Sequence, residues 1–295
     1  MKKILLLLAF VVISFASFAQ TLEGMFPYYE KEKVKKADLR KINYAIASDA
    51  DAVVLEEHIR ITPSFVDADS YLKKGLVSPM TVTETTWQKI KILTDEGVAK
   101  ANVVLESQEQ NVNYDKDSFE AYSYNLEGNK VVKNRIALQS VNIENLNDGT
   151  TRVSFEIPNV KSGSIIEYGY TKSFIASNSY YDRLMQSNMP KLKSVCYVTV
   201  DEKYQKAFHS IVLGGVDMDI NKNTTLDWWT SPPVQYGKMT AQNSISFSHS
   251  RGGGLTYGDT LFTTYAFSVE NLPALQSSAS DAAGVKVLFT DAAFK

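Results

Sequence analysis

Apolar and polar residues alternate along most of the chain between residues 45 and 275. The clearest stretches are DAVVLEEHIRITPSF, TVTETTWQKIKIL, SFEAYSYNL and SIIEYGYTKSF. A period of two is typical of strands that press one face against a core. Turn signals such as EGNK, NDGT and PNVKSG separate the stretches. The pattern predicts an all-β fold, a large antiparallel β-sandwich of two stacked sheets with about a dozen strands.

The two ends of the chain break this alternation. Residues 20–44 form a charged lead-in, in which 28–43 predict a short surface helix, and residues 45–275 form the sandwich domain. Residues 276–295 are rich in Ala and Ser and predict an irregular tail that begins as a loop and finishes as a marginal helix. A segment of this length cannot bury a core of its own.

Residues 1–19 have the pattern of a signal peptide. Lys2 and Lys3 precede an apolar run, and the small residues Ser17 and Ala19 stand at the −3 and −1 positions of a cleavage site. The apolar run is short for a membrane span, which needs roughly 20 residues. We therefore expect cleavage between Ala19 and Gln20 and a periplasmic or secreted protein, with no stable membrane insertion afterwards.

Charge and cysteine content narrow the function classes. The net charge is −2, and loss of the two signal-peptide lysines leaves 29 basic residues against 33 acidic ones. This weak acidity gives no electrostatic footprint for nucleic acid. Cys196 is the sole cysteine, so the chain has no internal disulfide even in an oxidising compartment.

The motifs for covalent or metal chemistry are absent from the sequence. Cys196 lies in the β-branched run VCYVTV, which predicts a buried strand thiol rather than a nucleophile at a helix N-terminus. His58, His209 and His249 are scattered and lack paired ligand spacing. We therefore expect no catalytic residue, no metal and no cofactor, although the three imidazoles could still converge in space.

Aromatic pairs and carboxylates leave two binding or catalytic alternatives open. In the pairs Trp228–Trp229 and Tyr180–Tyr181, neighbouring strand residues point to opposite faces, so one ring of each pair could be exposed to stack on a sugar or a peptide. A carbohydrate-active enzyme would instead need two carboxyl groups in an aromatic-lined groove, roughly 5 to 10 Å apart. A third reading is an assembly component that pairs through an unprotected edge strand.

Several stretches in a fixed order resemble one known family. They are SDADAVVL (48–55), KIKILTDEG (89–97), FEAYSYNLEGNKV (119–131) and FEIPNVKSGSIIEYGY (155–170), followed by YYDRLMQSNMP and ENLPAL. This order resembles the β-rich domain of unknown function that precedes transglutaminase-like modules in secreted bacterial proteins. The likeness covers about residues 45 to 275, and no single motif within it is decisive.

The resemblance implies a β-sandwich without catalytic residues of its own, because in such proteins a Cys-His-Asp triad belongs to the module that follows. After Leu275 this sequence departs from the family, and we expect a truncated product or a naturally short paralogue. The leading hypothesis is a non-catalytic module that binds a partner domain, a peptide or a glycan and accompanies a transglutaminase-like or peptidase domain.

Glu167 is the carboxylate that interrupts the strand SIIEYGY. Pro158 ends the strand before it and Gly163 suits the intervening turn. Alternation places Ile166, Tyr168 and Tyr170 on the core face, so we expect Glu167 on the opposite face, near solvent or paired with a cation. A structural carboxylate is the favoured interpretation, and a ligand contact is the alternative.

Overall fold

The computed structural model describes residues 32–65, 80–176, 180–201, 208–214, 224–227, 235–236, 239–249, 260–275 and 284–289. Strands dominate this part of the chain, and the helices are short: α2 (Lys36–Arg40) and the 3-10 turns η1 (Ala45–Ala47), η2 (Glu96–Ala101) and η3 (Leu138–Ser140). The predicted signal peptide, residues 1–19, lies outside the described residues. The prediction of an all-β fold with a short N-terminal helix is confirmed.

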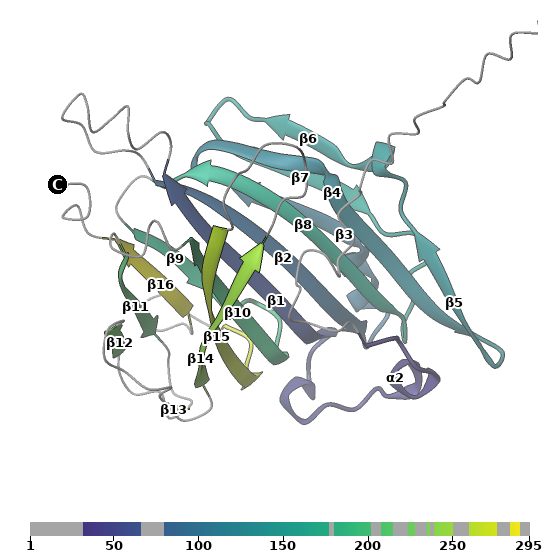
Figure 1. The fold of residues 1–295 in the computed structure, drawn as a ribbon. Coiled ribbons are helices and arrows are strands. Elements are labelled where there is room, and N and C mark those ends of the chain that lie inside the picture. Colours follow the sequence, from purple (N-terminus) through teal and green to yellow (C-terminus); the bar gives the residue numbers. More distant parts are fainter. Residues whose placement is uncertain are drawn as a thin grey trace, which may run out of the picture.

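One large, twisted sheet forms the first layer (Figure 1). Its nine strands run in the order β13 (Gln235–Tyr236), β14 (Met239–His249), β15 (Thr260–Leu272), β10 (Lys191–Asp201), β1 (Ala52–Phe65), β2 (Met80–Ile92), β8 (Ile165–Ile175), β4 (Gln110–Glu127) and β5 (Lys130–Arg135). All neighbours are antiparallel except β1 and β10, which run parallel. The parallel pair departs from the purely antiparallel prediction. Parallel neighbours need a long connection between them, and β1 and β10 are far apart in sequence, so local alternation does not reveal their pairing.

Two smaller sheets complete the sandwich. One has the order β3 (Asn102–Ser107), β7 (Thr151–Glu156) and β6 (Asn142–Asn145), and the other has the order β12 (Thr224–Asp227), β11 (Phe208–Gly214), β16 (Gly284–Phe289) and β9 (Tyr180–Leu184). Strand β16 falls within the predicted tail. The expectation of an irregular or helical tail is therefore wrong for Gly284–Phe289, which hydrogen-bond to both β11 and β9.

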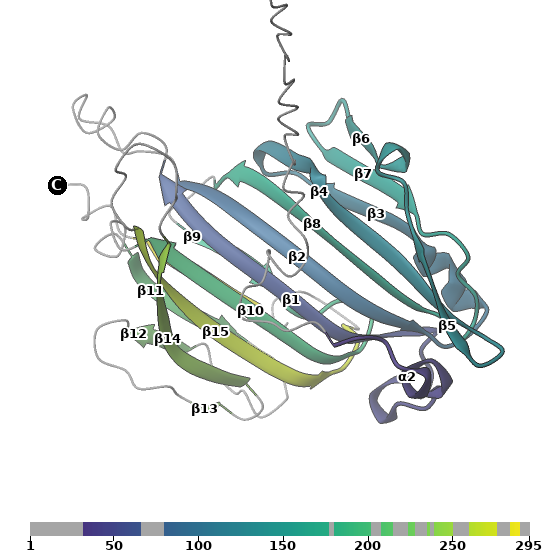
Figure 2. The ribbon, with the colours of Figure 1, turned by 45° about the vertical axis from the view of Figure 1, so that its right-hand side comes forward.

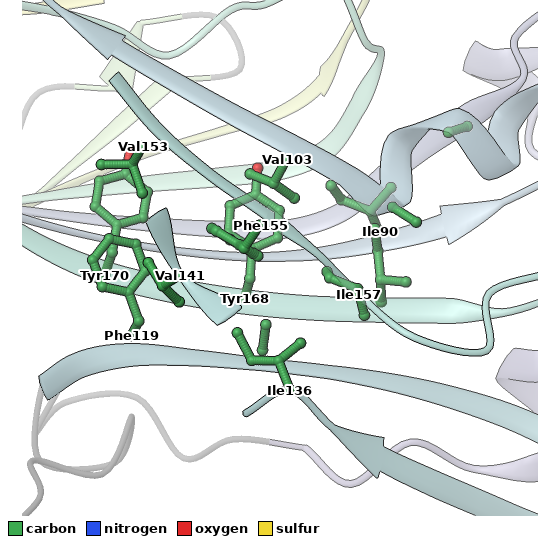
Figure 3. Packing of buried hydrophobic residues seen from close by; sticks show 14 of the residues in the cluster. Ile90, Val103, Phe119, Ile136, Val141, Val153, Phe155, Ile157, Tyr168 and Tyr170 are labelled. Atoms are coloured by element: carbon green, nitrogen blue, oxygen red, sulfur yellow. The ribbon is translucent and has the colours of Figure 1, made fainter. Parts of the chain in front are cut away.

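The main core lies between the large sheet and the β3-β7-β6 sheet. Strand β8 contributes Ile166, Tyr168 and Tyr170, as its alternation predicts, and β7 contributes Val153 and Phe155. Figure 3 shows Tyr168 and Tyr170 of β8 interleaved with Val153 and Phe155 of β7 between the two layers. A sandwich core of aromatic and branched residues is the dominant source of stability in such a fold.

Glycines shape two of the turns beside the strands, and one of them, Gly163, is a turn residue that the sequence predicts. Gly163 adopts φ of 85° in the turn before β8, a left-handed conformation that favours glycine. Gly97 lies within η2, where a Cβ would collide with the backbone carbonyl oxygen of Asp51. That same oxygen accepts hydrogen bonds from the amides of Leu93 and Thr94, so the turn is held close to the start of β1.

Candidate functional site

The core-facing side of the large sheet is apolar at the C-terminal end of strand β2 and polar in the middle of that strand. Along β2, alternation places Glu84, Thr86 and Gln88 on the same face as the core residues Ile90 and Ile92. Glu84 and Thr86 are buried, and Gln88 is half-buried. A buried carboxylate is costly unless it is paired, and buried ionisable groups cluster at functional sites, so the partners of these residues decide whether the face has a catalytic or a structural role.

Glu57, on β1 beside Gln88, is fully engaged by neighbouring side chains. Its Oε2 atom accepts hydrogen bonds from Lys191 Nζ at 2.7 Å and Ser194 Oγ at 2.6 Å, and Gln88 Nε2 donates to its Oε1 atom at 2.5 Å. The hydroxyl of Tyr168 donates in turn to Gln88 at 2.7 Å. Burial alone would raise the pKa of Glu57, but the ammonium of Lys191, the positive charge of Arg183 and the hydroxyl of Ser194 hold that pKa below its ordinary value. Glu57 is therefore an ionised structural anion.

Glu84 is the second buried carboxylate on this face. It accepts a hydrogen bond from the hydroxyl of Tyr181 and one from Thr86 Oγ1 at 3.3 Å. The guanidinium Nε of Arg183 lies 3.5 Å from its Oε2 atom. Burial opposes ionisation here too, yet the positive charge of Arg183 lowers the pKa of Glu84. Tyr181 and Arg183 both come from β9, so this contact fastens the four-stranded sheet to the large sheet.

Glu167 lies on the opposite face of the sheet from Tyr168 and Tyr170, as predicted. It is not near solvent: its side chain is fully buried, which corrects that half of the expectation. The predicted cation is present, because Lys89 Nζ lies 3.6 Å from Oε1, and the hydroxyl of Tyr124 donates to Oε2 at 2.8 Å. Burial raises the pKa of Tyr124, so its proton stays on the phenol. Glu167 has the geometry of a structural carboxylate.

Lys91, on the same face as Lys89, connects three segments of the chain. Its Nζ donates to the backbone oxygens of Leu39 and Gly163, at 2.6 Å each. The ammonium thus fastens the C-terminal part of α2 and the turn before β8 to the large sheet. Burial lowers the pKa of Lys91 from 10.5 to about 8.

We expect the stability conferred by Lys91 to rise with pH. Between about 8 and 10.5 the unfolded chain binds a proton at this residue that the folded chain has released, so unfolding becomes less favourable as the pH increases through that window. The measurement is urea denaturation of the wild type and of Lys91→Met across these pH values. The difference in unfolding free energy should move in favour of the wild type as the pH increases, and a constant difference would contradict the assignment.

Cys196 and His58 lie on adjacent strands but on opposite faces of the sheet. In the parallel ladder Cys196 is opposite Ile59, whereas His58 is opposite Val195. Side chains of neighbouring residues on a strand point to opposite faces, so the thiol and this imidazole cannot form a dyad. Burial also raises the pKa of Cys196, which keeps it as an unreactive thiol, as the sequence predicts.

His58 is enclosed by its own set of neighbours. Its Nε2 lies 3.1 Å from a carboxylate oxygen of Glu56, and the hydroxyl of Tyr197 lies 3.3 Å from Nδ1. The rings of Trp87 and Tyr197 pack against the imidazole. Burial lowers the pKa of His58, the main cause, against the opposing effect of Glu56. Among the residues that the structure describes, no group of three metal-binding side chains comes together.

A surface depression at the end of β3 brings two carboxylates, Glu106 and Glu109, near solvent. Its lining consists of Glu106, Ser107, Gln108, Glu109 and Thr150. Glu106 forms an ion pair with Arg152 at 2.8 Å, and Glu109 one with Lys172 at 3.4 Å. The lining has no aromatic ring, so the depression differs from the aromatic-lined groove that a carbohydrate-active enzyme would use.

The predicted aromatic contacts are only partly described. Trp228 and Trp229 lie outside the described residues, and for Tyr180 the structure describes the backbone alone. Tyr181 is buried, its ring packs on Phe174 with centroids 5.1 Å apart, and its hydroxyl is committed to Glu84. Tyr181 therefore has a structural role in the interior and is not placed to contact a ligand.

The interior ion pairs were not predicted from the sequence, although one signal for them was present. Glu84 and Gln88 are in phase with Ile90 and Ile92 in TVTETTWQKIKIL, so their core-facing position was readable. Their partners were not, because Lys191 is 134 residues from Glu57 and Tyr181 is 97 residues from Glu84.

No protein-family model and no curated protein matches this chain. Among solved structures, it is similar to a "putative protease" from Parabacteroides distasonis, with a TM-score of 0.50 and 10% identity. The match covers 83% of this chain and 41% of that one, so this chain spans well under half of the Parabacteroides protein. A "putative nutrient binding protein" from Legionella pneumophila matches at 13% identity over 80% of this chain and 67% of that one, but its TM-score of 0.25 carries no argument. At these identities, the first likeness shows the fold alone.

Proposed function

We propose that this chain is a non-catalytic β-sandwich module of a secreted or periplasmic bacterial protein. It accompanies a transglutaminase-like or peptidase domain and binds a partner domain, a peptide or a glycan. The observation that carries the proposal is the engagement of the interior ionisable groups: Glu57, Glu84 and Glu167 each have a cation and a hydrogen-bond donor within the chain. Groups held in this way stabilise the sandwich and are not poised to react.

Two further observations support the proposal. The thiol of Cys196 and the imidazole of His58 face away from each other across the sheet. The matching portion of the Parabacteroides protein is less than half of that chain, which fits a module within a larger protein.

Among the described residues, no helix combines the length and the apolar character needed to cross a bilayer. Export and cleavage after Ala19 stay predictions from the sequence.

The test combines turnover and binding by the full chain. Casein hydrolysis and incorporation of a fluorescent amine into casein measure peptidase and transglutaminase activity, and Cys196→Ser serves as the matched variant. Calorimetric titration with unfolded casein, soluble xylan, peptidoglycan fragments and a purified transglutaminase-like domain measures binding. We expect no turnover by either protein and saturable binding to one of these probes. Turnover that Cys196→Ser abolishes, or binding to none of the four, would overturn the proposal.

A further inference from the structure

Basic side chains gather at one corner of the molecule. Residues 32–41 carry five Lys or Arg residues against Glu32 and Asp38, and β5 carries Lys130, Lys133 and Arg135 with no acidic residue. All eight basic residues are exposed. Residues 32–41 and β5 together are here called the basic corner. Their excess of positive charge contrasts with the chain's net charge of −2. Charges of one sign on one surface repel one another and attract an oppositely charged partner.

Two segments far apart in sequence are held together to form the basic corner. Lys36 Nζ and Arg40 Nη2 both donate to the side-chain oxygen of Asn129, at 3.2 and 3.5 Å, in the turn between β4 and β5. Lys91, on the large sheet, donates a hydrogen bond to the backbone oxygen of Leu39 in α2. Figure 2 shows α2 beside the tip of the β4–β5 hairpin. The corner is therefore preorganised, which reduces the entropy cost of binding.

The basic corner includes an edge of the large sheet. Strand β5 ends the strand order and pairs only with β4 among the strands that the structure describes. An edge strand presents backbone donors and acceptors to which an added strand can hydrogen-bond. Lysine on an edge repels unselected strands, but it also selects for a strand that carries acidic residues. Lys133 lies over the ring of Tyr122, 3.6 Å from its centroid, so its charge is positioned beside the sheet face.

We propose that the basic corner docks an extended acidic segment of the partner protein, which adds to β5 as a further strand. This inference rests on the proposed function as a binding module and names the chemistry of its partner. An acidic polypeptide fits better than a nucleic acid, because it supplies both the opposite charge and backbone groups at strand spacing. Alternation along β5 places Lys133 and Arg135 on one face of the sheet and Lys130 on the other, so acidic residues of the added strand would lie beside Lys133 and Arg135 on one face and beside Lys130 on the other.

The test uses the full chain and short labelled peptides that alternate threonine with glutamate, glutamine or lysine. The variant Lys36→Gln/Lys130→Gln removes two charges from the basic corner, and Lys100→Gln/Lys116→Gln removes two charges elsewhere as the matched control. Fluorescence anisotropy should show that the glutamate peptide binds and that the glutamine and lysine peptides do not. We expect the first variant to bind the glutamate peptide about tenfold more weakly, because two exposed charges that attract the peptide are lost, and the control to bind like the wild type. Backbone amides of β5 should gain protection from hydrogen exchange in the complex.

The possible outcomes separate this inference from the proposed function. Equal weakening in both variants, no added protection in β5, or equally tight binding of a single-stranded oligonucleotide of the same charge would overturn the docking of an acidic strand. If the chain still bound its probe in the calorimetric titration, the proposed function would stand while this inference failed. If neither the glutamate peptide nor any of the four probes bound, both would fall.

Discussion

Replacing Lys191 with Met is expected to lower the free energy of unfolding by about 3–5 kcal/mol, because it leaves the carboxylate of Glu57 buried without its cation. The ammonium lies 2.7 Å from Glu57, and both side chains are almost fully inaccessible. Ser194 and Gln88 would still donate hydrogen bonds, but neither supplies a positive charge. Urea denaturation followed by tryptophan fluorescence measures the loss.

Two controls make this prediction sharp. Lys193→Met, two residues along β10, removes a half-exposed lysine that lies 3.8 Å from Glu56 on the other face, and it should cost only about 0–1 kcal/mol. The double variant Glu57→Gln/Lys191→Met removes both charges and should recover part of the loss, because no charge stays unpaired. Equal losses for the two lysine variants would show that the Glu57 pair is not the element that we describe.

Replacing Phe119 with Ala is the second change with a large expected effect, about 3–5 kcal/mol of unfolding free energy. Phe119 is buried between the layers, and its ring lies 5.8 Å from that of Tyr170 and 5.9 Å from that of Phe155 (Figure 3). Removing it opens a cavity at the point where the β3-β7-β6 sheet meets the large sheet.

The matched variants for Phe119 grade the effect by volume and burial. Phe119→Leu keeps most of the apolar volume and should cost roughly 1–2 kcal/mol. Val104→Ala truncates an apolar residue of β3 that is 57% exposed, and it should change stability by less than about 0.5 kcal/mol. Thermal and urea denaturation give the ranking, and a cost for Phe119→Ala no greater than that of Val104→Ala would contradict the two-layer core.

The interior charges and the charges of the basic corner have different roles in this molecule. Inside, Glu57, Glu84 and Glu167 each have a cation from a different strand, so these ion pairs fix how strands and layers meet. Outside, the lysines and arginines of α2 and β5 share only the weak acceptor Asn129 in the contact that joins them. Lys35 also lies near Glu32, and Arg135 near Glu120, at 3.8 Å each. The basic residues of the corner still outnumber the acidic ones, and this excess of positive charge attracts an acidic partner.

The strands of the large sheet were predictable because alternation is a local property. TVTETTWQKIKIL and SIIEYGYTKSF became β2 and β8, and the core face of β8 was assigned correctly from Ile166, Tyr168 and Tyr170. Strand β16 was missed, because its six residues are short and their strand conformation depends on β9 and β11 on either side. The burial of Glu167 was missed for a related reason: alternation separates two faces but does not say whether a face is covered.

The sequence by itself determined the fold class, the short N-terminal helix, the turn at Gly163 and the inert character of Cys196, since each follows from residue type and near-neighbour spacing. Only the tertiary structure decided that Glu57 meets Lys191, that β9 brings Tyr181 and Arg183 to Glu84, and that α2 joins β5 into one basic corner. These contacts depend on strand order and on the packing of layers, and the chain reaches them through separations that no local pattern encodes.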